Sequence, residues 1–150
     1  AFPAREAGKG DFRFNDTAGS MAKDSLFNAA AVVRAVTGKE ISDFDINVNF
    51  VGGGQIDGPS AGTAVTVALI SALTGKKVRQ DAAVTGEISV SGQVRAVGGI
   101  FEKAYGASRA GMKDMIIPAE NKDEITKHHL NLNIHAVTTI QEVMSLLFVE

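Results

Sequence analysis

The segment from residue 44 to residue 75 constrains the fold most, because it joins a strand pattern to a helix pattern through a glycine-rich turn. In 44–50, large apolar residues alternate with aspartate and asparagine, which predicts a strand with one buried face. A turn with four glycines follows at 52–58. Pro59 suits the first turn of the next helix and Gly75 suits its end. The sequence therefore predicts that a sharp turn delivers the residues around Pro59 to the mouth of a helix.

The rest of the chain predicts further strands and helices that together indicate an α+β fold. Apolar positions spaced by three and four residues predict a long helix between Gly19 and Gly38. Two strand-like runs, 83–90 and 93–97, are joined by a Ser-Gly pair, which is typical of a hairpin turn. The other expected elements, in chain order, are a strand at 11–15, a helix at 100–110, a strand at 115–117, a helix at 120–128, a strand at 134–137 and a helix at 139–148. Hairpin strands and this alternating tail favour a mixed sheet with packed helices.

Composition narrows the class of protein. The 150 residues have the size of one domain, and no repeat or linker divides them. A net charge of −2 argues against a nucleic-acid-binding surface. Without cysteine the chain has no disulfide, which suits a reducing, cytoplasmic compartment. We expect no membrane segment, because no apolar run approaches the roughly 20 residues that span a bilayer. The first residue is alanine rather than methionine, so we expect a piece of a longer protein.

Ser60 is the first candidate for chemistry. It lies two or three residues into the predicted helix, where free N–H groups favour negative charge. A tetrahedral intermediate on Ser60 Oγ would place its oxyanion among such donors. The small residues Gly58, Ala61 and Gly62 would let a substrate backbone approach closely. Taken alone, the pattern is more typical of a serine that caps a helix in a turn.

Lys103 is the second candidate. In the predicted helix 100–110, Lys103 shares a face with Ile100, Ala104 and Ala107. Burial disfavours the charged amine and lowers its pKa, which makes lysine a base able to take a serine proton near neutral pH. The alternative is a lysine that lays its stem on the core and extends its amine into water.

Two rival chemistries fit less well. We expect no metal site, because the three histidines lie late in the chain and form no two-histidine zinc pattern. Residues 53–60 have the glycine spacing of a phosphate-binding loop. Such loops carry lysine where this chain has Pro59, and Asp57 would repel a phosphate. A bound nucleotide is therefore not expected in this chain.

Short motifs run in order over nearly the whole chain: Asp57-Gly58-Pro59-Ser60-Ala61-Gly62, Val84-Thr85-Gly86-Glu87-Ile88, Gly92-Gln93-Val94, Val97-Gly98-Gly99, Ser108-Arg109-Ala110-Gly111, and Met115-Ile116-Ile117-Pro118 followed by Glu120-Asn121. With these motifs, and with its spacing of Ser60 and Lys103, the sequence resembles the proteolytic domain of the Lon family of Ser-Lys dyad peptidases. The resemblance implies an α+β domain similar to the second domain of ribosomal protein S5.

The resemblance assigns roles to single residues. Ser60 would be the nucleophile and Lys103 the general base and later acid. Thr85 would support the lysine with its hydroxyl, although a plain strand threonine would look the same. Asp57 would shape or switch the loop before Ser60, and an aspartate that only closes a turn is an equal alternative. Gly58 and Ala61 complete the matching motif around the nucleophile.

The resemblance also implies a setting. The domain would hydrolyse peptide bonds of unfolded or damaged polypeptides through an acyl-enzyme, as part of a hexameric ring. ATP and Mg would act on an ATPase region that this chain lacks, and the family domain's first strand or two would precede residue 1. Asn47-Val48-Asn49 and Ile56 depart from common bacterial residues, so the branch of the family stays open. The alternative function is a non-catalytic, Lon-like assembly domain.

Overall fold

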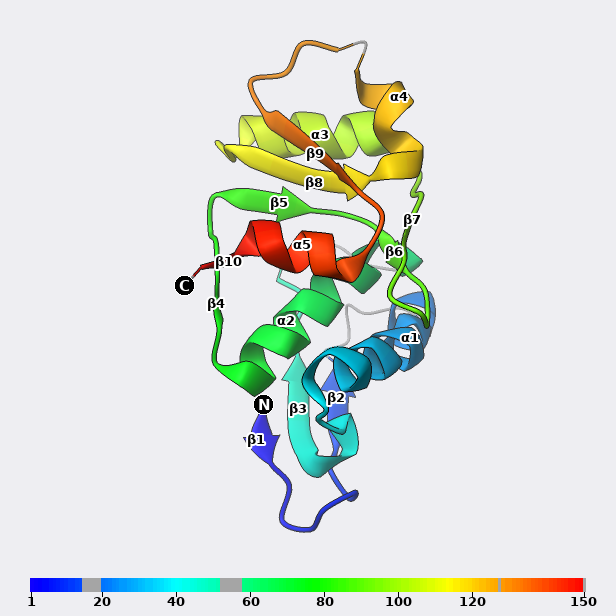
Figure 1. The fold of residues 1–150 in the computed structure, drawn as a ribbon, viewed down its shortest axis with the longest axis vertical. Coiled ribbons are helices and arrows are strands. Elements are labelled where there is room, and N and C mark those ends of the chain that lie inside the picture. The colour runs from blue at the N-terminus through cyan, green and yellow to red at the C-terminus, as the bar shows by residue number, and fades with distance from the viewer. Residues whose placement is uncertain (15–19, 52–57, 127, 150) are drawn as a thin grey trace.

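A computed structural model describes residues 1–14, 20–51, 58–126 and 128–149 of the chain (Figure 1). Its N-terminal part is a small mixed sheet with β3 (Phe44–Val48) in the centre. β1 (Phe2–Pro3) pairs with β3 in antiparallel fashion, and β2 (Phe12–Phe14) pairs with it in parallel. The predicted strand at 44–50 is therefore confirmed but two residues shorter. A 3-10 turn, η1 (Ile41–Asp43), leads into β3.

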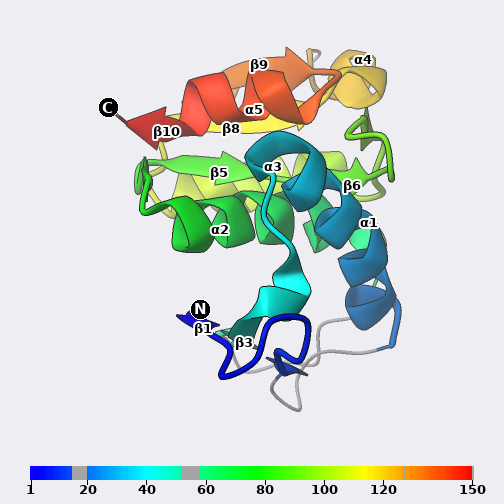
Figure 2. The same ribbon diagram turned by 60° about the horizontal axis from the view of Figure 1, so that its bottom comes forward.

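Two helices cover this sheet and carry half of the buried residues of the larger core cluster. α1 (Ser20–Thr37) and α2 (Gly62–Thr74) pack against each other, as their apolar patterns predict. α2 ends at Gly75, whose positive φ of 74° is the left-handed cap typical of glycine. Figure 2 shows that β1 and β3 lie at the end of the molecule opposite β8 and β9.

A parallel sheet in the order β5-β8-β9 forms the other part of the fold. Its strands are β5 (Ala82–Val84), β8 (Asp114–Pro118) and β9 (Asn133–Val137). α3 (Ile100–Arg109) and α4 (Lys122–Ile125) cover one face, and α2 and α5 (Ile140–Leu147) cover the other (Figure 1). β8 is buried on both faces, as parallel strands usually are.

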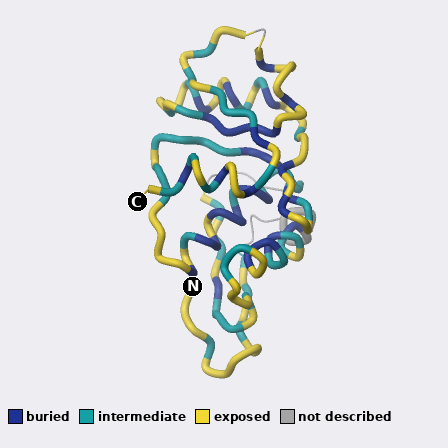
Figure 3. The backbone as a smooth tube through the Cα atoms, in the orientation of Figure 1, coloured by how far each residue is buried: buried dark blue, intermediate teal, exposed yellow. Residues whose placement is uncertain are grey.

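β8 separates the two apolar clusters of the core. Ile116 belongs to the larger cluster, which it shares with α1, α2 and α5. Met115 and Ile117 point the other way, into the smaller cluster beneath α3. Buried residues follow this strand through the middle of the molecule, whereas the loop between β1 and β2 is largely exposed (Figure 3). The helix that bears Lys103 therefore rests on one side of β8, and the helix that follows Ser60 lies on the other.

The structure corrects several predicted boundaries. The run 83–90 is not one strand: β5 pairs with β8, and the hairpin with β7 (Val94–Arg95) uses only β6 (Glu87–Ile88). The chain breaks between them because Gly86 turns its backbone toward the start of α2. The helix expected at 120–128 is a 3-10 turn, η3 (Ala119–Asn121), followed by the short α4. The last expected helix ends at Leu147, because β10 (Phe148–Val149) pairs with β4 (Lys77–Val78). The α+β class itself is confirmed.

Candidate active site

Ser60 lies in a 3-10 turn, η2 (Pro59–Ala61), immediately before α2. The sequence predicts it inside the first turn of the helix, and the structure places it just ahead of that turn. Gly58 precedes the turn with a φ of 109°, a left-handed backbone conformation that glycine adopts without strain. Ser60 and Ala61 are both half-buried. The serine is therefore held at the surface by a tight turn.

Backbone hydrogen bonds join this turn to Gly86. The N–H of Gly86 donates to the carbonyl oxygen of Ser60 at 3.1 Å, and the N–H of Thr63 donates to the carbonyl oxygen of Gly86 at 3.0 Å. The contact is too close for a side chain at residue 86, where an added Cβ would lie 2.6 Å from Val94 Cγ1 and 2.9 Å from Thr63 Oγ1. Gly62 approaches Ile88 almost as closely, because an added Cβ would lie 3.0 Å from Ile88 Cγ2. Glycine at 62 and 86 thus lets the turn dock directly on the segment that follows β5.

These bonds also limit the donors that an oxyanion could use. The N–H of Gly62 donates to the carbonyl oxygen of Pro59, and that of Thr63 to Gly86. An oxyanion on Ser60 would have to use donors outside this pair. Thr63 Oγ1 is fully buried and has no hydrogen-bond partner among the residues that the structure describes.

Lys103 lies on the inner side of α3, as the sequence predicts. Its neighbours Ile100 and Ala104 are fully buried, and Glu102 is exposed. Lys103 itself is half-buried. Burial lowers the pKa of the Lys103 amine from its ordinary value, and no charged group among the described residues contributes to this shift. The Lys103 amine therefore loses its proton at a lower pH than the amine of a lysine in water.

Ser60 lies beside Thr85 and Gly86. In the part of the chain that the structure describes, Ser60 and Lys103 are not joined by a hydrogen bond. Thr85 is 6% exposed, and its hydroxyl lies 3.5 Å from the carbonyl oxygen of Ser60. This distance is at the outer limit for a hydrogen bond. Asp57 lies outside the described residues, as does most of the loop 52–58.

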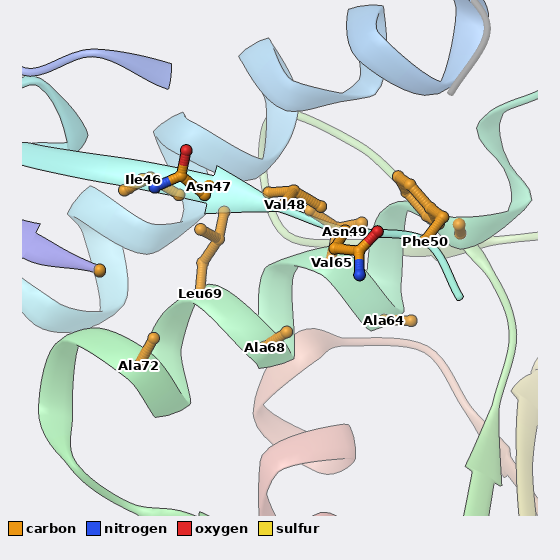
Figure 4. Close-up of a pocket in the computed structure, with 12 residues that line it drawn as sticks. Ile46, Asn47, Val48, Asn49, Phe50, Ala64, Val65, Ala68, Leu69 and Ala72 are labelled. Carbon is orange, nitrogen blue, oxygen red and sulfur yellow. The ribbon is translucent and has the colours of Figure 1, made fainter. Parts of the chain in front are cut away.

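An apolar pocket of about 320 Å³ opens between β3 and α2. Ala61, which follows Ser60 directly, is one of its lining residues. Figure 4 shows Phe50 and Ala64 toward one end of the pocket and Ala72 at the other. The remaining lining residues are Ala1, Ile46, Asn47, Val48, Asn49, Val65, Ala68 and Leu69. The pocket has the chemistry to take an uncharged, largely apolar group beside Ser60.

Sequence reasoning found no role for two residues that the structure places around the candidates. Gly86 holds the turn of Ser60, and Asn121 binds the backbone of Val97 ahead of α3. Both residues belong to the short sequence motifs on which the resemblance rests, and this was the feature of the sequence that could have pointed to them. Within the described part of the chain, no three metal-ligating side chains gather, and no helix is long and apolar enough to cross a membrane.

Comparison with known proteins places the chain in a family. A family model described as "Lon protease (S16) C-terminal proteolytic domain" matches residues 4–150. The chain is 46% identical to a Lon protease of Haemophilus influenzae over 153 residues, which cover 94% of this chain and 19% of that protein. It is 41% identical to a Lon protease of Fusobacterium nucleatum over 155 residues (95% of the chain, 20% of the relative). It is 36% identical to an archaeal Lon protease of Archaeoglobus fulgidus over 128 residues (83% and 21%).

The chain spans about a fifth of the length of these curated relatives. Bacterial and archaeal relatives both match, so the branch stays open. The resemblance seen in the sequence is confirmed, and with it the class of chemistry. The chain belongs to the Lon protease (S16) C-terminal proteolytic domain family and is a serine-peptidase domain of the Lon type.

Proposed function

We propose that this domain cleaves unfolded or damaged polypeptides, with Ser60 as the nucleophile and Lys103 as the general base. The observation that carries the proposal is the state of Lys103. Lys103 is half-buried on the inner side of α3, the pKa of its amine is lowered, and no described residue forms an ion pair with it. A lysine in this state can be neutral when it meets a serine hydroxyl.

The reaction would run through an acyl-enzyme. Neutral Lys103 Nζ takes the Ser60 proton while Oγ attacks the carbonyl carbon of the substrate, which generates a tetrahedral oxyanion. The Lys103 ammonium then gives its proton to the leaving amine, and an ester remains on Ser60. Water then attacks this ester while Lys103 takes a proton from the water. The product acid leaves as Lys103 returns the proton to Ser60. Lysine thus acts alternately as base and acid.

This mechanism requires Ser60 Oγ and Lys103 Nζ to come within about 2.6–3.2 Å, a contact that often tightens only when substrate binds. In that state Thr85 is proposed to turn its hydroxyl toward the lysine. Its present contact with the Ser60 carbonyl is weak enough to exchange. Asp57 is proposed to shape the loop before the nucleophile, Gly58 to allow its sharp turn, and Ala61 to leave room for the substrate backbone.

The pocket and the names of the relatives support this substrate class. The pocket beside Ala61 suits an apolar side chain next to the scissile bond, and such side chains are exposed in unfolded polypeptides. The relatives are named Lon protease, which supports polypeptide substrates. The net charge of −2 makes nucleic acid an unsuitable partner.

The rest of the setting is proposed from the family. The chain would work in the cytoplasm as part of a hexameric ring of identical subunits. ATP and Mg would act on an ATPase region in the remaining four fifths of such proteins, and this domain would need no cofactor of its own. A non-catalytic assembly domain is the second candidate, favoured by the missing hydrogen bond between Ser60 and Lys103.

Cleavage of casein and of a fluorogenic peptide separates the two candidates. We expect cleavage by the chain and its loss in both Ser60→Ala and Lys103→Ala, with unfolding temperatures close to that of the unmutated protein. Activity that survives in Ser60→Ala would contradict the assigned nucleophile. A folded but inert unmutated protein, tested both as this chain and within its longer parent, would favour the assembly domain.

A further inference from the structure

Asn121 is a fully buried polar side chain that the mechanism does not use. It is 1% exposed and ends the 3-10 turn η3, between β8 and α4. Its Oδ1 accepts a hydrogen bond from the N–H of Val97 at 2.9 Å, and its Nδ2 donates to the carbonyl oxygen of Val97 at 2.9 Å. The second Nδ2 proton goes to Glu124 Oε1, also at 2.9 Å. One amide thus pairs both backbone groups of a residue 24 positions away.

Val97 is the last residue with a side chain before the helix of Lys103. Gly98 and Gly99 follow it, and both are exposed. An added Cβ at Gly98 would meet nothing within 4 Å, so this residue is not held by packing. Gly99 caps α3 with a φ of 65°, and its carbonyl oxygen accepts the N–H of Lys103 at 3.1 Å. The two-glycine link thus lies between two anchors: the backbone of Val97, bound by Asn121, and Ile100, the first residue of α3, which is 1% exposed.

Within the described residues, other hydrogen bonds and ion pairs hold this segment as far as β7, and beyond it the Val97 side chain packs against the smaller apolar cluster. The N–H of Val94 donates to the carbonyl oxygen of Thr138, and Arg95 forms an exposed ion pair with Glu120 at 3.1 Å. Beyond Arg95, the backbone of Val97 is bound by Asn121. η3 lies beside β7, and α4 packs on α3, so the amide sits where the strand, the turn and the helix meet (Figure 1).

We propose that Asn121 is a positioning residue for the base: it fixes the start of α3 and thereby the place and burial of the Lys103 amine. The proposal rests on the proposed function, since it matters for catalysis only if Lys103 is the base. Without the amide, the N–H and carbonyl of Val97 lose their partner, and the link 98–99 is free to move. The lysine would then spend more time in water, away from Ser60.

The test compares Asn121→Ala and Asn121→Asp with the matched control Glu124→Ala. The control removes the hydrogen bond of Asn121 that does not touch Val97, from an exposed residue. We expect kcat to fall by about tenfold to a hundredfold in the Asn121 variants with little change in KM, because a misplacement of about 1 Å costs that much. We also expect the pH at which activity rises to move upward, toward that of an ordinary lysine. Glu124→Ala should keep the kcat and the pH profile of the unmutated protein.

A readout that needs no activity separates this inference from the proposed function. The pKa of Lys103 is followed by NMR of its 13Cε signal in the chain and in the three variants, below their unfolding temperatures. A rise in both Asn121 variants but not in Glu124→Ala supports the positioning role, even if the chain proves inert. An unchanged Lys103 titration in folded Asn121→Asp, or an unchanged kcat and pH profile in an active Asn121 variant, would overturn it. Should Asn121→Ala not fold, Asn121→Asp carries the test, because it keeps the acceptor for the N–H of Val97.

Discussion

Replacing Gly86 by alanine should damage stability and catalysis together. The new methyl group would lie 2.6 Å from Val94 Cγ1 and 2.9 Å from Thr63 Oγ1, well inside ordinary contact distance. Val94 is 2% exposed and Thr63 is fully buried, so neither can turn into solvent to make room. The backbone of residue 86 must therefore shift away from the start of α2.

The size of the effect follows from these contacts. Overpacking of a tight core site typically costs about 1–3 kcal/mol. For a domain of this size, each kcal/mol lowers the unfolding temperature by about 2–4 °C. The shift would also strain the 3.1 Å bond from Gly86 to the carbonyl oxygen of Ser60 and move the nucleophile. Because a misplacement of about 1 Å can cost a hundredfold in rate, kcat should fall much more than KM rises.

Calorimetry and peptide cleavage measure the two effects, and Gly106→Ala is the control. Gly106 lies in α3 with nothing within 4 Å of an added Cβ, so alanine there should stabilise the helix by about 0.5–1 kcal/mol. If Gly86→Ala unfolds at the same temperature and cleaves at the same rate as the unmutated protein, the close docking of the Ser60 turn is refuted.

Three further predictions concern acid stability, helix capping and substrate choice. Hydrogen bonds from His135 and Arg79 lower the pKa of Asp114 to about 2, so the stability that Asp114 contributes is present above its unfolded pKa of 3.8 and is lost as the pH falls toward 2. In Asp114→Asn, the urea midpoint of unfolding should therefore fall less steeply between pH 5 and pH 2 than in the unmutated protein. An unchanged slope would contradict this. The Thr139 hydroxyl oxygen accepts a hydrogen bond from the N–H of Glu142 at the start of α5. Thr139→Ala should therefore lower the free energy of unfolding, measured in urea, by about 1 kcal/mol. No change would show that this cap is unimportant. Ala64→Phe should fill the pocket between β3 and α2. It should lower kcat/KM more for peptides with a large apolar residue at the scissile bond than for matched peptides with alanine there. An equal loss for both peptides would argue against the pocket as a substrate site.

Features set by local periodicity could be read from the sequence. The apolar spacing of α1, the alternation in β3 and the placement of Lys103 on the inner side of α3 all depend on neighbours within one or two turns. The order of motifs also sufficed to identify the family, because residues 4–150 match it as a whole. The class of fold and the class of chemistry were thus within reach of the sequence, whereas the dyad of Ser60 and Lys103 stays a prediction.

Features set by contacts between distant segments could not be read in this way. The run 83–90 alternates like a single strand, and only the docking of Gly86 on Ser60 and Thr63 divides it. The pairing of β10 with β4 joins two-residue strands near opposite ends of the second half of the chain, and it takes Phe148 from the expected helix. The bonds of Asn121 to Val97 likewise leave no periodic trace. The relative position of Ser60 and Lys103 belongs to the same class, so their pairing stays a prediction.

The dependence of kcat/KM on pH, from 6 to 10, tests the central claim most directly, with Lys103→Arg as the companion variant. If neutral Lys103 is the base, activity rises through one ionisation that lies below the ordinary lysine pKa, because burial lowers that of Lys103. Lys103→Arg should be inactive throughout, since arginine stays charged over this range. A flat profile, or measurable cleavage by Lys103→Arg, would contradict the account.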